Sequence, residues 1–360
     1  MSNTHIYPTK YELIEVLTSI TNRTFLNSFA QERGAFITHV TLESLANEIS
    51  NMFLDNDDLE IIRKEAYHIN ASHTLSGFVV KSTDKNFNLK NSYQWIFDEG
   101  KQKFGQKINQ LVKVTPESNV YKGSIEYNKK RAGRIEFLQD EISHFDFYLE
   151  EKSPGNWQVE IDGNRSTDSK ELKDLFHEVL NSDANIENIE QILLTTELSI
   201  QFFDSLANNG MPSDWKFSDI KHLTLKMGNA DEQKSGDSED DTEKIETVKE
   251  EALVGITQAI LQGQNLRENT FVQQSVKSGY RFNAMTYEFH HKTDPFIIQL
   301  KAEFKGRPKV FEVSIVNYDQ QIGIAASREA ANLSASENRK IRSDFWNNSK
   351  EIYNKLIKRK

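Results

Sequence analysis

Two groups of residues in the sequence have the outline of a metal-dependent nuclease site. In such a site an Asp and a Glu hold a divalent ion, and a nearby Lys assists the attacking water. The first group is Asp294 with the Glu-x-Lys triplet formed by Glu303 and Lys305. A second group of the same form consists of Asp140 or Asp146 with Glu150 and Lys152. Asp294 and Glu303 are therefore the candidate metal ligands. Solvent exposure on the polar face of a strand explains Glu303 equally well.

Motifs of the common cofactor and hydrolase sites do not occur in the sequence. It has no cysteine, no glycine-rich phosphate loop, no GxSxG and no HExxH. His290 and His291 lie beside Asp294, but adjacent residues of a strand point to opposite faces, so these two rings are not expected to converge on a metal. We therefore predict no cofactor, and we leave open whether the protein is an enzyme.

A basic block runs from Lys81 to Arg134, where basic residues outnumber acidic ones by roughly two to one. Aromatic residues are interleaved with its lysines. This combination is typical of a groove for single-stranded nucleic acid, in which bases stack on rings and ammonium groups follow the phosphates. An amphipathic helix with buried rings and solvated lysines is the alternative, and the scarcity of Arg favours it. Its predicted apolar stripe consists of Trp95, Ile96, Phe104, Ile108 and Leu111.

The turn Asn128 to Gly133 adds a second cluster of positive charge within this block, at the tip of a predicted hairpin. Lysine and arginine side chains at such a tip are placed to contact phosphates without reading sequence. The candidate nucleic-acid-binding residues are Lys101, Lys103, Lys107, Lys129, Lys130 and Arg131.

Composition points to a globular protein with a negative net charge. The chain has 360 residues, of which 37% are hydrophobic and 27% charged, and its net charge is −10. This balance argues against wrapping of nucleic acid over the whole surface, which needs many basic side chains. No apolar run approaches the ~20 residues that span a bilayer. We therefore expect a cytoplasmic protein that does not bind membranes, and the richness in Asn, Lys and Ile suggests a bacterial or phage gene.

Residues 279–317 contain three runs that alternate apolar and polar residues, separated by short turns with Gly or Pro. In the third run Phe311 and Val313 alternate with Glu312 and Ser314, which predicts a buried face and a polar face toward water. Short turns between such runs predict an antiparallel meander. Residues 119–162 repeat this pattern, so we expect a second meander there.

Helical and low-complexity segments complete the domain prediction. Residues 1–72 carry apolar residues at spacings of three and four, which indicates a helical bundle. Residues 229–251 are acidic and almost free of apolar residues, so we expect a flexible linker there. These boundaries leave a domain with an antiparallel sheet at 73–228, and a helix–meander–helix domain at 252–360.

The predicted fold class is thus α+β, with an N-terminal helical bundle followed by antiparallel β-meander sheets packed with helices. Separated charged surfaces favour a non-catalytic cytoplasmic binding protein that acts on a partner protein or on nucleic acid. A metal-dependent nuclease is the first alternative. A component of a bacterial or phage defence system is the second.

Overall fold

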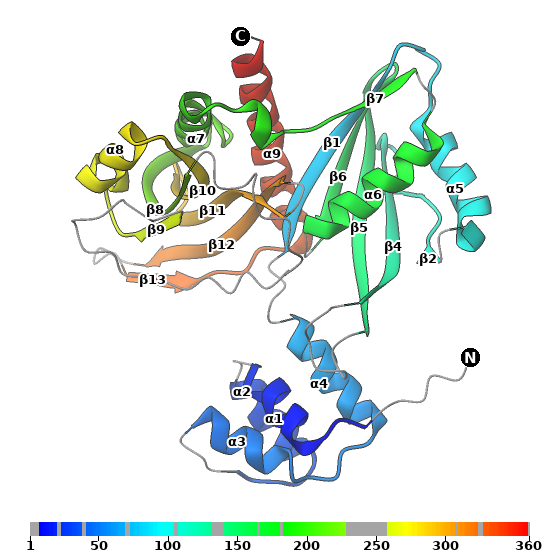
Figure 1. The fold of residues 1–360 in the computed structure, drawn as a ribbon, viewed down its shortest axis with the longest axis vertical. Helices are drawn as coiled ribbons and strands as arrows, with labels where there is room; N and C mark the ends of the chain where they lie inside the picture. The colour runs from blue at the N-terminus through cyan, green and yellow to red at the C-terminus, as the bar shows by residue number, and fades with distance from the viewer. Residues whose placement is uncertain are drawn as a thin grey trace. The chain divides into compact units, whose positions relative to one another are not determined.

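The computed structural model describes residues 7–19, 23–37, 41–68, 73–103, 107–130, 140–163, 166–180, 183–227, 258–306, 309–322 and 327–358. This part of the chain is a mixed α+β structure with nine α-helices and a large antiparallel sheet (Figure 1). It divides into two compact units, residues 1–72 with 126–144, and residues 73–125 with 145–360. The predicted linker at 229–251 lies outside the described residues, and no described helix is long and apolar enough to cross a membrane.

The first unit contains four helices that share one apolar cluster. They are α1 (Lys10–Ser19), α2 (Arg23–Glu32), α3 (Leu42–Ile49) and α4 (Asn56–His68). Leu17, Leu26 and Ile49 are fully buried in this cluster. Thr41 caps α3 by accepting a hydrogen bond from a backbone N–H of the first turn, as its position before an apolar run predicts.

The second unit is built on a 13-stranded sheet. Its first half contains β1 (Thr74–Ser82), α5 (Leu89–Lys103), β2 (Lys107–Ile108), β3 (Val112–Lys113), β4 (Val120–Lys130), β5 (Asp140–Ser153), β6 (Asn156–Gly163) and α6 (Ser166–Val179). Its second half contains β7 (Ala184–Glu187), α7 (Thr196–Asn209), β8 (Trp215–Met227), β9 (Gln258–Gln262), α8 (Thr270–Lys277), β10 (Tyr280–His291), β11 (Phe296–Lys305), β12 (Val310–Ile322), β13 (Ser327–Ala330) and α9 (Ala335–Ile357). The last residues of β4 and the first residues of β5 belong to the first unit.

The two halves follow a similar order of elements, a strand and a helix, then antiparallel strands, then a helix, except that α8 separates β9 from β10 in the second half. The strand order β2-β4-β5-β6-β1-β12-β11-β10-β8-β9 places the halves side by side. They meet where Thr74 and Leu75 of β1 pair with Ser314 and Val313 of β12, and where the end of β1 pairs with β7. The strands predicted on either side of residues 229–251 therefore belong to one sheet, and not to separate sheets in separate domains.

The last helix of each half covers a different face of the sheet near this junction. A side chain at Gly77 of β1 would meet the indole of Trp346, so α9 lies on that face. The next residue, Phe78, contacts Phe176 of α6 with ring centroids 6.1 Å apart, so α6 lies on the other face. Figure 1 shows α6 crossing in front of β1, β6 and β5.

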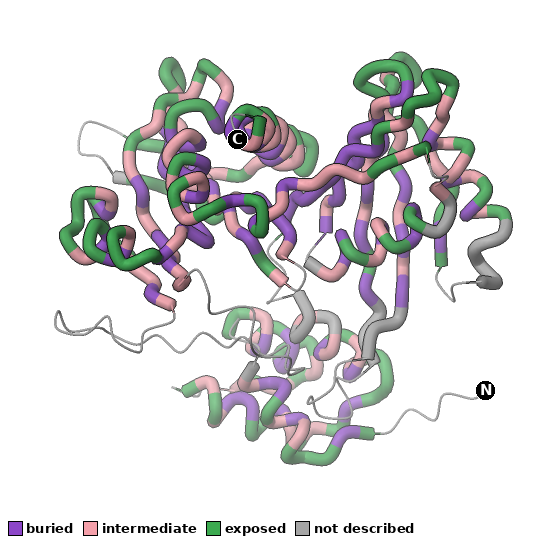
Figure 2. The backbone as a smooth tube through the Cα atoms, turned by 45° about the horizontal axis from the view of Figure 1, so that its top comes forward, coloured by how far each residue is buried: buried purple, intermediate pink, exposed green. Residues whose placement is uncertain are grey.

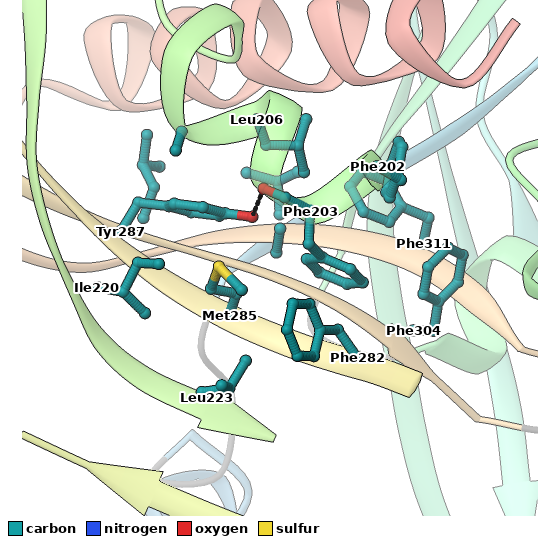
Figure 3. Close-up of a cluster of buried hydrophobic side chains, with 14 of the residues drawn as sticks. Phe202, Phe203, Leu206, Ile220, Leu223, Phe282, Met285, Tyr287, Phe304 and Phe311 are labelled. Carbon is teal, nitrogen blue, oxygen red and sulfur yellow. Dashed lines mark hydrogen bonds between the residues drawn. The ribbon is translucent and has the colours of Figure 1, made fainter. Parts of the chain in front are cut away.

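The largest apolar core lies between the second half of the sheet and helices α7 and α9. Phe202 and Phe203 of α7 pack among Phe282, Phe304 and Phe311 in this core (Figure 3). Figure 2 shows buried residues following the strands, with exposed residues on the outer sides of the helices and in the turns.

The three strands predicted from residues 279–317 are β10, β11 and β12, and they form the expected antiparallel meander. Two other expectations differ from the structure. Helix α5 ends at Lys103, so Ile108 lies in β2 and not on a common helical stripe with Trp95, which is 42% exposed. Glu312 and Ser314 do not face water, and they are only 1% and 6% exposed, because β1 and α6 adjoin this face of β12.

Candidate nucleic-acid interface

The basic block of the sequence places positive side chains around the outer strands of the first half, on both faces of the sheet. We call the side chains Lys90, Lys107, Lys113, Tyr121 and Lys122 the basic edge. Lys90 comes from α5, Lys107 from β2 and Lys113 from β3, while Tyr121 and Lys122 come from β4. Three of the four lysines are exposed, and Lys90 is half-buried.

Tyr121 lies between two of these lysines. Lys90 Nζ donates a hydrogen bond to the Tyr121 hydroxyl at 3.2 Å and lies 4.4 Å from the ring centroid. Lys113 is the cross-strand partner of Tyr121, and its Nζ lies 5.9 Å from the same centroid. The ring quadrupole attracts both ammonium groups, so Tyr121 fixes two flexible lysines at one place on the surface.

On the opposite face of the sheet, Tyr148 of β5 has a similar environment built around Lys122. The Arg339 guanidinium of α9 lies 3.5 Å from the Tyr148 ring centroid, and Lys122 Nζ lies 5.9 Å from it. Lys122 also pairs with Asp146 at 2.7 Å, and this hydrogen bond raises the pKa of the Lys122 amine. Burial is the main reason that the pKa of the Tyr148 hydroxyl is raised as well. Lys122 is therefore charged, and Tyr148 is neutral, throughout the physiological pH range.

Apolar surface adjoins the lysines of the basic edge. Val112 is 65% exposed on β3, directly before Lys113, and Val114 is 46% exposed directly after it. Trp95 is partly exposed on α5, five residues after Lys90. Most other rings of the block are less exposed, and Tyr93 is fully buried with its hydroxyl donating to the Asn109 carbonyl at 2.6 Å. The edge thus combines ammonium groups with a limited area of exposed aromatic and aliphatic surface.

Among the nucleic-acid-binding residues proposed from the sequence, only Lys107 has a described side chain. Lys101 and Lys103 lie near the end of α5, and Lys129 and Lys130 lie at the end of β4; for these four the structure describes the backbone alone. Arg131 lies outside the described residues. The sequence pattern did not single out Tyr121 or Tyr148, because their contacts with lysines and Arg339 depend on strand pairing and on a helix from the far end of the chain.

The two candidate metal ligands lie at opposite ends of β11. Asp294 is in the turn before the strand, where its carboxylate contacts His291 Nδ1 at 3.0 Å. Glu303 is near the other end and pairs with Lys301 at 2.7 Å. A strand of this length separates the two carboxylates by roughly 30 Å. They therefore do not form one site. No group of three or more His, Asp or Glu side chains is placed to hold a metal ion within the described ranges.

His290 and His291 also have separate environments, as their positions on a strand predict. His290 contacts Glu288 at 3.3 Å, whereas His291 packs edge-on against Trp215 with ring centroids 4.9 Å apart. In the second group proposed from the sequence, Glu150 pairs with Lys152 and Asp146 pairs with Lys122. These carboxylates are therefore engaged by two different lysines, and the side chain of Asp140 lies outside the described part of the structure.

A buried charge network on the second half was not foreseen from the sequence. The Glu288 carboxylate, 2% exposed, accepts hydrogen bonds from Arg328 at 2.7 Å and from Gln299 at 3.0 Å, and Lys221 lies 3.4 Å away. Burial alone would raise the pKa of Glu288, but these donors together with His290 lower it to about 2. Alternation on a strand indicates that Glu288 lies on the polar face, but it does not show that four elements enclose it.

Comparison with known proteins gives no family for this chain. No family model matches it, and no curated protein is similar enough to count as a relative. Functional inference therefore depends on the geometry alone.

Proposed function

We propose that the protein is a non-catalytic cytoplasmic binding protein and that its basic edge contacts nucleic acid. At Tyr148 both cations are already paired with carboxylates, Lys122 with Asp146 and Arg339 with Glu160. The observation that carries this proposal is therefore the placement of Lys90 and Lys113 within 6 Å of the Tyr121 ring centroid. Cations held in this way present N–H groups to phosphates at a reduced entropic cost, since part of their rotamer freedom is already lost.

Single-stranded nucleic acid fits this edge better than a duplex. The lysines come from one helix and three strands and do not form the projecting helix that enters a major groove. Trp95 offers a surface on which an unpaired base can stack. Lysines without arginine forks favour contacts with phosphates and little reading of sequence. We therefore expect binding that is weakly sequence-dependent and strongly salt-dependent.

The test is a fluorescence-polarisation titration at several salt concentrations with single-stranded DNA, single-stranded RNA and duplex DNA. The variant replaces Lys90, Lys107 and Lys113 with Glu. Its matched control replaces three exposed lysines of the second half with Glu, at Lys216, Lys277 and Lys292. Both variants change the net charge equally, so a difference in their affinities depends on where the replaced lysines lie and not on the total charge.

We expect the edge variant to bind every sequence more weakly and to lower the slope of log K against log salt by about 2, since each phosphate contact contributes ~0.7 for single strands. The control should retain wild-type affinity. Equal loss in both variants would show that only net charge matters. No binding of any nucleic acid at micromolar protein would refute this function. A third variant, with Glu at Lys129, Lys130 and Arg131, tests the hairpin tip proposed from the sequence.

A partner protein is the second candidate, and exposed rings of the first unit favour it. Tyr11 is 78% exposed, Phe36 83% and Phe53 91%, on helices or connections of the first unit. Large exposed aromatic side chains are enriched where proteins bind each other. Replacing these three with Ser should leave nucleic-acid affinity unchanged and should abolish co-purification of a partner protein from the native host.

A further inference from the structure

Glu312 of β12 is a buried carboxyl group without a hydrogen-bond donor. It is 1% exposed, and neither of its oxygens has a hydrogen-bond partner in the part of the chain that the structure describes. Buried polar groups in folded proteins are almost always paired, so a carboxylate in this position needs an explanation. It lies two residues from Ser314, the point where β12 meets β1 and the two halves of the sheet join.

The charged groups that face Glu312 come from β11 and α6. Glu303 is directly opposite on β11, and Lys301 and Lys305 flank Glu303 on the same strand face. Asp168 approaches from the first turn of α6 and is fully buried. Lys301 is already engaged, because its Nζ lies 2.7 Å from a Glu303 oxygen. β1 contributes only hydroxyl groups near this point, those of Thr74 and Ser76.

This environment disfavours the ionised form of Glu312 on two grounds. Removal from water penalises a charged carboxylate more than a neutral carboxyl group, and Glu303 and Asp168 add like charge nearby. Lys305 and Lys301 act to lower the pKa of Glu312, but their effect is smaller than that of burial and the two carboxylates. Together these effects raise the pKa of Glu312 to about 8, with burial as the largest cause.

We propose that Glu312 binds a proton in the folded protein at neutral pH, and that release of this proton in mildly alkaline solution loosens the junction between the two halves of the sheet. The neutral carboxyl group needs less solvation than the carboxylate. Deprotonation leaves a third negative charge beside Glu303 and Asp168 without water or a donor to stabilise it.

The direction of the pH effect follows from linkage. A carboxyl group whose pKa is higher in the folded state binds its proton more tightly when folded, so its contribution to stability is complete below the unfolded pKa. That contribution is lost as the pH rises toward 8. In the window between the two pKa values, the unfolding equilibrium constant should rise about tenfold for each pH unit.

Urea denaturation at several pH values, with Glu312→Gln beside wild type, measures this slope. The variant keeps the shape of a neutral carboxyl group but has no proton to lose. The unfolding constant of wild type divided by that of the variant should increase about tenfold per pH unit between about pH 5.5 and 7.5, and level off above about pH 8. Glu329→Gln, at an exposed position on β13, is the matched control and should give a constant ratio.

A second measurement uses the wild-type protein and does not depend on folding of the variant. Carbon-13 NMR of the glutamate side-chain carboxyl carbons reports protonation directly, and the resonance absent from Glu312→Gln or Glu312→Asp identifies Glu312. We expect one glutamate resonance to titrate with a midpoint near 8. If every glutamate carboxyl is ionised at pH 6, or if the stability ratio does not change with pH, the proposal is refuted.

Discussion

The ion pair between Arg342 and Asp162 joins the two halves of the sheet and gives a sharp test of how α9 is held. Arg342 lies on α9 in the second half, and its side chain is 3% exposed. It donates two hydrogen bonds to the carboxylate of Asp162 on β6 in the first half, at 2.9 and 3.3 Å. One turn earlier, Arg339 contacts Glu160 at 2.7 Å, and Ser343 also hydrogen-bonds to Glu160.

Removing either partner should lower the free energy of unfolding, but by different amounts. Asp162→Ala leaves a buried guanidinium group without its counter-charge, which costs about 3–5 kcal/mol. Arg342→Met leaves a carboxylate that is 18% exposed and therefore partly hydrated, so its cost should lie near or below the lower end, about 3 kcal/mol. The double variant should lose clearly less than the sum of the two, because no unpaired buried charge remains in it.

Urea denaturation of wild type, both single variants and the double variant gives this cycle, with the free energy of unfolding as the readout. We expect a coupling energy of about 1–3 kcal/mol. Glu351→Ala, which removes an exposed intrahelical partner of Lys355 on the same helix, is the control and should cost less than about 0.5 kcal/mol. Additive losses, or single losses below 1 kcal/mol, would show that this pair does not hold α9 against the first half.

Three further changes test other parts of the second unit. Leu300→Ala should lower the free energy of unfolding by about 2–5 kcal/mol in urea denaturation, because Leu300 is fully buried in the main core; a loss below about 0.5 kcal/mol would contradict this placement. Gly77→Ala should cost about 1–3 kcal/mol and lower the melting temperature, since the new methyl carbon would lie 2.5 Å from the Val159 carbonyl oxygen and 3.1 Å from the Trp346 ring; an unchanged melting temperature would refute this. The pKa of Glu288 is lowered from 4.5 to about 2, so ionised Glu288 adds up to about 3 kcal/mol to the free energy of unfolding above pH 4.5, and this contribution is lost as the pH falls toward 2. Glu288→Gln should remove this part of the acid dependence when the free energy of unfolding is measured against pH, and an unchanged profile would refute the assignment.

Local patterns in the sequence were enough to predict the strands of the main core. Alternation from Phe296 to Phe304 predicts a strand with one apolar face, and β11 spans Phe296–Lys305 with Leu300 and Phe304 buried. This works because the period of two is fixed by strand geometry and does not depend on which strand lies alongside. The short turns with Gly and Pro likewise predict antiparallel neighbours.

Pairing between distant segments could not be predicted in the same way. The contact of β1 with β12 joins residues about 240 positions apart, and the sequence of neither strand specifies which strand it pairs with. This pairing places α6 beside β12 and buries Glu312, which the sequence pattern assigns to the solvent side. The contact between Tyr148 and Arg339 has the same cause, because it requires a helix from the second half to reach the first half. The basic block that supplies the lysines of the candidate interface is visible in the sequence, but only Lys107 was among the predicted binding residues, and the rings that position the lysines were not predicted.

The two proposals predict responses to different solution conditions, which allows each to be tested alone. Contacts between the basic edge and phosphates depend on exposed lysines, so binding should fall steeply with salt. Hydrogen bonding to Asp146 raises the pKa of Lys122, so it keeps its charge and binding should change little between about pH 6 and 8. Stability of the junction should instead depend on pH and only weakly on salt. Glu312 is buried from solvent, which limits screening by salt, and its proton is lost in mildly alkaline solution. A nucleic-acid affinity that followed the titration of Glu312 would therefore show that the junction and the basic edge are coupled, and independent responses would show two separate features on one sheet.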